Sequence, residues 1–372
     1  MKPRLGTMLR SCRQRARDSF ERVRITQGAY TRCTMLVCGE RLDIARSQVH
    51  PLLDWVPDQR VGWLLRENAH RPALWRKTQP QVAFLQSYWD TPFVEMESLI
   101  ALIREESPRT KICYLDWFAP ANVPEPRLID LVDLYVKKNI LRDRSQYLNG
   151  MCETNLVEYE AQWDAEFLNP RQGVLTEQQL SKLTVGWSFA TDRRLVEALQ
   201  SDAMANTDRP IDLHCRIFSK NERTWYHHMR NRCVESVNEL ATGAAEGEKI
   251  VCSAARLDWD AYMRELASSK ACLSPFGYGE VCWRDFEAIA AGAVLVKPNM
   301  DHLEVFPDIY IPGETYIDID WSFSDLKAKY ESTRDSGLRK KLAGNAWQRW
   351  KSFVATDWNN HWNDTLQKLL ET

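Results

Sequence analysis

The sequence predicts an α/β protein of two domains, each organised around a parallel sheet. Its 372 residues are enough for two hydrophobic cores. Short apolar runs alternate with segments of helical periodicity, which is the pattern of parallel sheets connected by helices. The third observation is the stretch 274–298, SPFGYGEVCWRDFEAIAAGAVLVKP, which has the pattern of a glycine-rich loop, a helix and a buried strand in succession.

The first half of the chain contains the expected strands of one sheet. Four apolar runs each end in polar or turn residues, and two further short segments follow them. The runs are 34–37, 61–65, 82–85 and 111–115, and the further segments are 128–136 and 183–187. Between the third and fourth runs, residues 92–105 carry apolar side chains at helical spacing and predict a helix, with Met96, Leu99, Ile100 and Ile103 on one face.

A polar segment, 201–210, ends in proline and has the composition of an interdomain linker. A second series of strands and helices follows it. We expect strands at 211–218, 249–253, 271–273 and 293–296, shorter ones at 309–311 and 315–319, and helices at 223–240, 259–268, 284–291, 325–333 and 338–370. The predicted organisation is an arm at 1–24, a first domain at 25–200, the linker at 201–210, a second domain at 211–340 and terminal helices at 341–372.

The stretch 274–298 resembles the nucleotide-sugar site of GT-B glycosyltransferases, of the group 1, CgeB-like or fucosyltransferase-like type. The resemblance lies in a loop with Glu280, a second glutamate at Glu287, a small-residue helix end and an apolar strand. Six residues separate the two glutamates, where retaining families have seven, so the stereochemistry of transfer stays open. The resemblance implies two Rossmann-like domains that face each other across a cleft, with a C-terminal helix crossing back to the first domain.

The resemblance also implies roles for individual residues of the second domain. Arg216 and Lys220 stand at the carboxyl end of its first strand, where similar enzymes hold the donor diphosphate, and both side chains suit phosphate. Arg284 would neutralise a phosphate oxygen at the helix start. The remaining donor residues are Tyr278 and Gly279 against the nucleotide or sugar, Glu280 on a sugar hydroxyl and Glu287 on the ribose. The alternative for Glu280 is a favourable charge at a helix N-terminus.

Three carboxylates at strand ends of the first domain are candidates for a catalytic base. Removing the proton of an acceptor hydroxyl requires such a group, and function in α/β sheets gathers at the carboxyl ends of strands. Glu67 is the preferred candidate, because its segment GWLLREN resembles the acceptor side of some inverting fucosyltransferases. Asp116 and Asp90 are the rivals. The alternative for each is a helix cap or a surface ion pair.

Composition excludes several classes of protein. The net charge of −2 gives no overall attraction to nucleic acid, so we expect no nucleic-acid partner. Ten scattered cysteines without a C-x-x-C pair argue against zinc ribbons and for a reducing, cytoplasmic location. The basic arm at 1–24 is either a solvated face or a peripheral membrane foot. The fifteen tryptophans are either carbohydrate platforms or packing residues.

The predicted function is the metal-independent transfer of a sugar from a nucleotide-sugar donor to a glycan or glycoconjugate hydroxyl. No cofactor and no metal are expected, because no D-x-D stands at a strand end of the first half and no P-loop motif occurs. Two alternatives remain open on the sequence alone. One is a non-catalytic nucleotide- or sugar-binding protein that kept the two-lobed fold, and the other is a nucleotide-sugar epimerase.

Overall fold

The structure is a computed structural model, and it describes residues 34–56, 61–150, 154–167, 173–187, 189–200, 208–220 and 222–371. The chain divides into two compact units. The first contains the described parts of Met1–Trp117, Arg127–Val136 and Leu366–Thr372, and the second contains those of Phe118–Pro126 and Lys137–Thr365. The predicted basic arm at 1–24 and most of the predicted linker, 201–207, lie outside the described residues.

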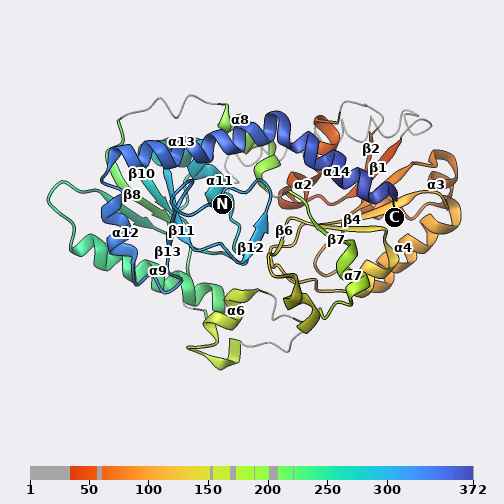
Figure 1. The fold of residues 1–372 in the computed structure, drawn as a ribbon, viewed down its shortest axis with the longest axis horizontal. Helices are drawn as coiled ribbons and strands as arrows, with labels where there is room; N and C mark the ends of the chain where they lie inside the picture. The colour runs from red at the N-terminus through yellow and green to blue at the C-terminus, as the bar shows by residue number, and fades with distance from the viewer. Residues whose placement is uncertain are drawn as a thin grey trace, which may run out of the picture. The chain divides into compact units, whose positions relative to one another are not determined.

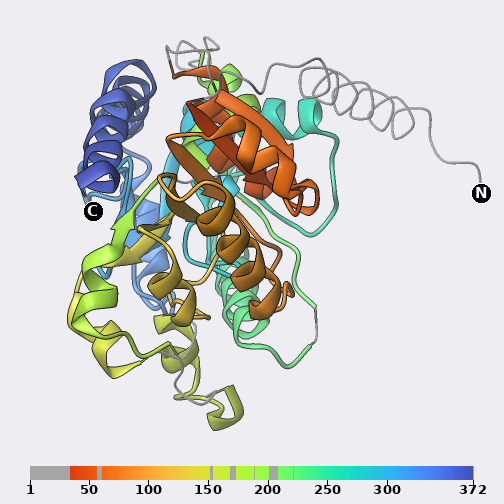
Figure 2. The ribbon, with the colours of Figure 1, turned by 90° about the vertical axis from the view of Figure 1, so that its right-hand side faces the viewer.

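The sheet of the N-terminal half has the strand order β2-β1-β3-β4-β5-β7, and its pairs β2-β1, β1-β3 and β3-β4 are parallel. Every residue of β1 and β3 is buried, as expected for a parallel sheet covered on both faces. Figure 2 turns the strands and helices of the first unit, in red to orange, towards the viewer. The elements are β1 Met35–Gly39, β2 Val61–Leu65, β3 Val82–Leu85, β4 Lys111–Asp116, β5 Leu134–Lys137, β7 Leu183–Val185, α2 Asp43–Asp54, α3 Pro72–Thr78, α4 Phe93–Glu106 and α5 Arg127–Leu131.

The second unit contains a five-stranded sheet with the order β13-β11-β10-β8-β9, parallel throughout. In Figure 1, α9 runs along one side of this sheet and α13 along the other. Both parallel sheets confirm the predicted α/β class. The elements are β8 Ile211–Arg216, β9 Ile250–Ser253, β10 Ser269–Leu273, β11 Val294–Pro298, β13 Ile317–Ile319, α8 Arg193–Leu199, α9 Trp225–Thr242, α10 Trp259–Ala267, α11 Trp283–Ala290 and α12 Leu326–Ser332.

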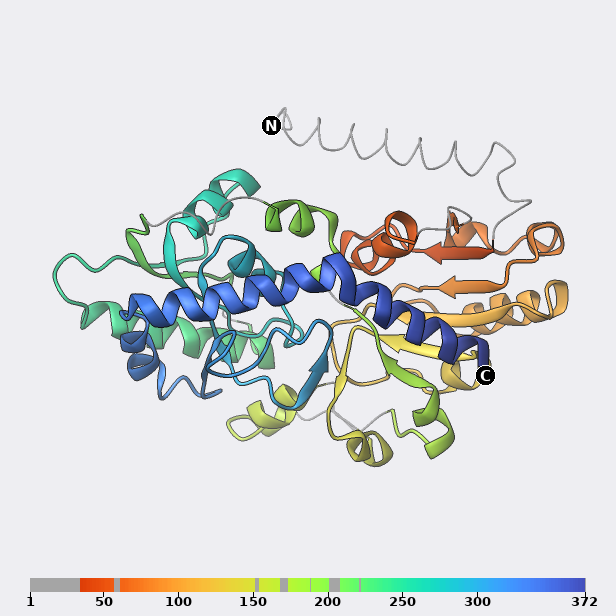
Figure 3. The same cartoon turned by 45° about the horizontal axis from the view of Figure 1, so that its top comes forward.

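The remaining elements include a two-stranded antiparallel sheet and the C-terminal helices. Figure 3 shows α13, a π-helical turn and α14 as one continuous run of helix. Two of its tryptophans, Trp350 and Trp358, are packing residues, since their side chains are at most 1% exposed. No helix in the described ranges has both the length and the apolarity to cross a membrane. The elements are β6 Asn139–Leu141, β12 Leu303–Val305, α6 Asn155–Glu160, α7 Glu177–Lys182, α13 Ser336–Ser352, the π-helix Phe353–Asp357, α14 Trp358–Glu371 and short 3-10 turns at Arg66–Asn68, Arg144–Asn149, Ala165–Phe167 and Phe189–Thr191.

One predicted strand is wrong. Residues 309–311 form no strand, although Ile309 and Tyr310 are buried. The segment lies between Pro307 and Pro312, which lack the N–H that a ladder requires. The Ile311 N–H instead donates to the hydroxyl of Thr315, 2.9 Å away, within a turn. Buried apolar residues therefore mimic a strand pattern here without a sheet partner.

His214, in the middle of β8, generates a pH-dependent prediction. Its side chain is fully buried, with Nε2 2.9 Å from Glu265 Oε1, and burial lowers the pKa of His214 from 6.5 to about 4. The folded state therefore resists protonation of His214. The contribution of neutral His214 to the free energy of unfolding is fully present above pH 6.5 and is lost as the pH falls towards 4. Over that range, the wild type should lose about 3 kcal/mol more free energy of unfolding than His214→Gln, which keeps a donor but does not titrate. Urea denaturation at several pH values measures this, and parallel curves for the two proteins would contradict it.

Candidate functional site

Two arginines join the loops that follow β8 and β10. Arg284, in the first turn of α11, donates to the carbonyl oxygens of Arg216 and Pro275, each 3.2 Å away. Arg230, on α9, donates to the carbonyl oxygens of Phe218 at 2.9 Å and Phe276 at 3.3 Å. Each guanidinium thus holds both loops at once, at the carboxyl edge of the sheet, where open α/β sheets bind ligands.

Neither Arg230 nor Arg284 forms an ion pair with a carboxylate among the described residues. Burial and the neighbouring Arg284 charge lower the pKa of Arg230. Carbonyl oxygens satisfy these donors but leave both guanidiniums without an ion-paired carboxylate among the described residues, although the Glu287 carboxylate is near enough to feel the Arg284 charge. An anion with oxygens in more than one direction, such as a diphosphate, would compensate them.

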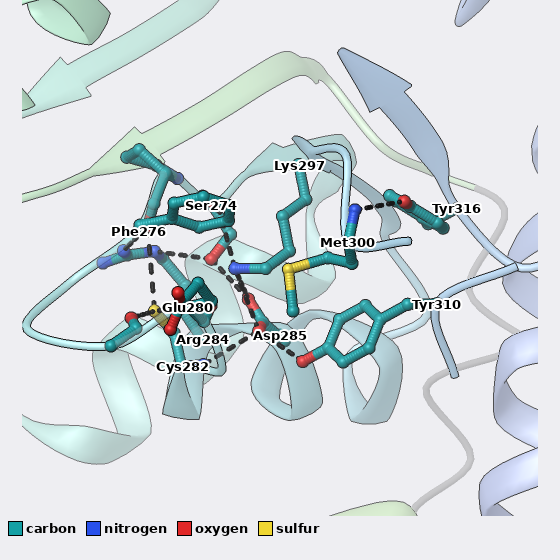
Figure 4. A network of polar contacts seen from close by, with 12 residues as sticks. Ser274, Phe276, Glu280, Cys282, Arg284, Asp285, Lys297, Met300, Tyr310 and Tyr316 are labelled. Carbon is teal, nitrogen blue, oxygen red and sulfur yellow. Dashed lines mark hydrogen bonds and ion pairs between the residues drawn. The ribbon is translucent and has the colours of Figure 1, made fainter. Parts of the chain in front are cut away.

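The N-terminus of α11 is fixed by a buried polar network (Figure 4). The Asp285 carboxylate accepts hydrogen bonds from the Ser274 hydroxyl at 2.5 Å, the Tyr310 hydroxyl at 2.6 Å and the Cys282 N–H at 2.9 Å. It also pairs with the Lys297 ammonium at 3.1 Å, and both charged side chains are fully buried. The loop, the helix start and β11 are therefore held together by a carboxylate with every oxygen occupied.

Glu280, in contrast to Asp285, is a buried carboxylate without hydrogen-bond donors among the described residues. Its carboxylate is fully buried, and both oxygens have no hydrogen-bond partner among the described residues. His302 Nε2 lies 3.5 Å from Glu280 Oε1, and it too has no hydrogen-bond partner among the described residues. The His302 ring packs edge-on against Trp321, which packs against Phe276 in the same way. An unsatisfied buried carboxylate and imidazole beside an aromatic wall have open hydrogen-bonding capacity for a polyhydroxyl ligand.

Glu287 and Tyr262 form a second polar pair, one turn into α11. The Tyr262 hydroxyl donates to Glu287 Oε2 at 2.9 Å, and burial raises the pKa of Glu287. Of the two carboxylate oxygens, only Oε2 is engaged by this bond, which leaves Oε1 available as an acceptor. The pair joins α10 to α11.

Arg216 and Lys220 differ from the other predicted donor residues because their charges are already paired. Arg216 makes a two-point ion pair with Glu265, with nitrogen–oxygen distances of 2.5 and 2.8 Å. Lys220 is half-exposed and pairs with Glu222 at 2.9 Å. Arg216 thus contributes its backbone carbonyl to the site through Arg284, whereas its side chain is committed to α10.

Tyr278 and Gly279 occupy the middle of the glycine-rich loop. Tyr278 is 52% exposed and packs against Trp225 and Tyr226 at the start of α9. Gly279 is required for a protein contact, since a Cβ there would lie 2.6 Å from the carbonyl oxygen of Ala119. The glycine therefore allows backbone to approach backbone, in addition to any ligand.

The three candidate bases lie on the first unit in different environments. The Glu67 carboxylate is exposed and forms an ion pair with Arg41 at 2.6 Å. Asp90 is exposed in the turn after β3. Asp116 is fully buried, and its Oδ2 accepts a hydrogen bond from the Tyr135 hydroxyl at 2.8 Å. Access to an acceptor thus favours Glu67 and Asp90 over Asp116.

A fourth carboxylate, Glu40, was absent from the sequence-based candidates. It follows β1, is buried, and forms an ion pair with Arg66 at 2.5 Å. Arg66 also pairs with Glu95, so two carboxylates share one guanidinium. Burial raises the pKa of Glu40 in spite of Arg66. Only its position directly after the first strand could have indicated it from sequence.

Other residues missed from sequence come from segments remote from the loop. They are Arg230, Tyr262, His302 and Trp321, in addition to the Asp285 partners Lys297 and Tyr310. Within the described ranges, no cluster of three or more His, Cys, Asp or Glu side chains has the arrangement of a metal site.

Comparison with solved structures identifies the architecture. An alpha-glucosyltransferase in complex with UDP matches 89% of this chain and 98% of its own, with a TM-score of 0.51 and 10% sequence identity. An alpha-glucosyltransferase in complex with UDP-glucose and DNA containing an abasic site matches 90% and 98%, with a TM-score of 0.52 and 10% identity. The chain has the GT-B fold. No protein-family model and no curated protein matches the sequence.

The comparison confirms the predicted GT-B architecture but distinguishes none of the three subfamily types. A third neighbour is an alpha-glucosyltransferase in complex with UDP and a 13-mer DNA containing an HMU base, with a TM-score of 0.52 and 10% identity. DNA in two of these complexes runs against the expectation that nucleic acid takes no part.

The Asp285 network generates a stability prediction. Asp285→Ala leaves the Lys297 ammonium fully buried without its anion, so the free energy of unfolding should fall by about 3–5 kcal/mol. Urea denaturation measures the loss. The double variant Asp285→Leu with Lys297→Met removes both charges and should recover part of it. A single variant within about 1 kcal/mol of the wild type would show that the pair is not tightly desolvated.

Proposed function

We propose that the protein is a glycosyltransferase that moves a sugar from a nucleotide-sugar donor to an acceptor hydroxyl. The observation that carries the proposal is the pair of guanidiniums, Arg230 and Arg284, that hold the loops after β8 and β10 without a carboxylate partner among the described residues. In a GT-B fold, an uncompensated cationic pair at a sheet edge suits the diphosphate of such a donor. UDP or UDP-glucose in the neighbouring structures makes UDP the first nucleotide to test.

The donor would be held by three groups of residues in the second unit. The two arginines bind the diphosphate. Their interaction with it becomes stronger when negative charge develops on the leaving group. Glu287, oriented by Tyr262, accepts hydroxyls of the ribose through its remaining oxygen. Tyr278, the exposed side chain of the glycine-rich loop, would lie against the nucleotide or sugar.

The transferred sugar would bind against the side chains of Glu280 and His302. A buried carboxylate without a donor partner accepts hydroxyl hydrogens, and His302 lies 3.5 Å from it to share the same hydroxyls. Trp321 and Phe276 supply an apolar wall for the C–H face of the ring. The cost of burying Glu280 unpaired is then offset when the sugar binds.

In the proposed reaction, the oxygen of the acceptor hydroxyl forms a bond with the anomeric carbon, and the bond from that carbon to the diphosphate oxygen breaks. The bonding electrons leave with the diphosphate, where Arg230 and Arg284 stabilise them. In an inverting reaction the hydroxyl proton passes to a carboxylate, for which Glu67 is the proposed base and Asp90 the rival. No step in this scheme requires a metal ion.

Nucleotide binding tests the cationic pair. In a thermal-shift experiment, UDP at about 100 times its Kd should add about 2.7 kcal/mol of stability to the wild type. Arg284→Met and Arg230→Met keep the aliphatic volume but lose the charge, so each should weaken UDP binding at least about tenfold. Arg349→Met, on an exposed face of α13, is the matched control and should bind like the wild type. Unchanged binding by both site variants would remove the basis of the proposal.

Transfer activity tests the base. Glu67→Gln keeps the size of the side chain and loses proton acceptance, so turnover should fall about 100-fold or more while UDP binding stays unchanged. Glu97→Gln, on an exposed position of α4, serves as the control. Full transfer by Glu67→Gln, together with loss in Asp90→Asn, would reassign the base to Asp90.

A further inference from the structure

Trp89 has the highest exposure among the large apolar side chains of the described residues. It is 68% exposed, in the turn between β3 and α4, and Val94 in the first turn of α4 is 62% exposed. An indole in water leaves a large apolar area unburied, which costs stability unless a ligand covers it. The turn follows β3 at the carboxyl edge of the parallel sheet, where ligands bind in this class of fold.

The Trp89 ring is held in place on the protein side. The Tyr88 N–H donates to the Thr91 hydroxyl at 3.0 Å, and the Thr91 N–H donates to the Tyr88 carbonyl oxygen at 3.2 Å, so the turn is closed by two hydrogen bonds. Tyr88 and Trp117 pack edge-to-face against the indole at centroid distances of 6.0 and 6.1 Å. Trp117 is itself buried and donates to the Ser87 carbonyl oxygen at 2.8 Å. The indole is therefore a pre-organised platform, which lowers the entropic cost of binding.

Charges at this sheet edge identify the chemistry of the occupant. The guanidiniums of Arg41 and Arg66 are each already paired, Arg41 with Glu67 and Arg66 with two further carboxylates, and the Arg127 guanidinium stacks on the Phe93 ring at 4.1 Å. Asp90, which follows Trp89 in the sequence, is exposed. Binding a nucleic-acid backbone requires cations that can neutralise phosphates. Carboxylates beside a flat aromatic face instead suit an uncharged ring with hydroxyl donors.

We propose that Trp89 is the stacking platform for the acceptor, and that this acceptor is a neutral glycoside. The inference rests on the proposed glycosyltransferase function and adds the class of acceptor and the residue that recognises it. The C–H face of a sugar ring covers the indole. Hydroxyl groups at the ring edge donate to exposed carboxylates at this edge of the sheet, of which Asp90 is the nearest in sequence.

Saturation-transfer NMR on the full chain with saturating UDP tests the inference. The probes are maltose, cellobiose, N,N′-diacetylchitobiose and methyl β-galactoside, with a 13-mer duplex DNA as the competing class. At least one glycoside should bind the wild type. Trp89→Ala should weaken that binding about tenfold or more, and Trp89→Phe should restore most of it because the flat ring returns. Val94→Ala is the matched control at the same edge and should leave the affinity unchanged.

The UDP thermal shift is measured for every variant and separates the two claims. If UDP binds normally and Trp89→Ala leaves the glycoside affinity unchanged, Trp89 is not the stacking platform. Binding of DNA with no glycoside overturns the acceptor class, and so does the absence of binding by every probe. Loss of the UDP shift in the wild type itself would instead contradict the proposed function, whatever the glycosides do.

Discussion

The site depends on two guanidiniums that have carbonyl partners and no carboxylate among the described residues. Arg284 and Arg230 each bridge the loop after β8 and the loop after β10, so the geometry of both loops follows from these four hydrogen bonds. An ion-paired carboxylate would neutralise each guanidinium within the protein itself, as Glu265 does for Arg216. For Arg230, burial and the neighbouring Arg284 charge lower the pKa, so holding this charge without a carboxylate costs stability.

The glycine-rich loop and the first turn of α11 carry one unsatisfied and one satisfied buried carboxylate, and only the satisfied one is explained by the fold itself. Asp285 has donors on both oxygens and a buried ammonium beside it, which fixes the start of α11. Glu280, five residues earlier, is equally buried but has no donor. Proteins rarely leave such a group unpaired, so Glu280 is where a ligand's hydroxyls are expected. The rigid network holds the open carboxylate in position.

The sequence predicted what is local and missed what the fold brings together. The loop, helix and strand at 274–298 were predictable because their glycine, helical and apolar patterns are contiguous. Arg230 was not predictable. Helix α9 carries many polar residues, and Arg230 differs from them only because its guanidinium lies close to Gly277 in the folded chain. His302 was not predicted, since its distance to Glu280 depends on the pairing of β10 with β11. The Arg216 side chain was assigned to phosphate, but Glu265 from α10 already occupies it.

Calorimetric titration of the wild type with UDP, UMP and uridine tests whether Arg230 and Arg284 form a diphosphate site. All three ligands share the base and ribose, and they differ only in the anionic groups that Arg230 and Arg284 would bind. UDP should bind at least about 100-fold more tightly than uridine, with the difference shrinking as salt is raised. Equal affinities for UDP and uridine, or binding of neither, would show that the two charges do not form a diphosphate site.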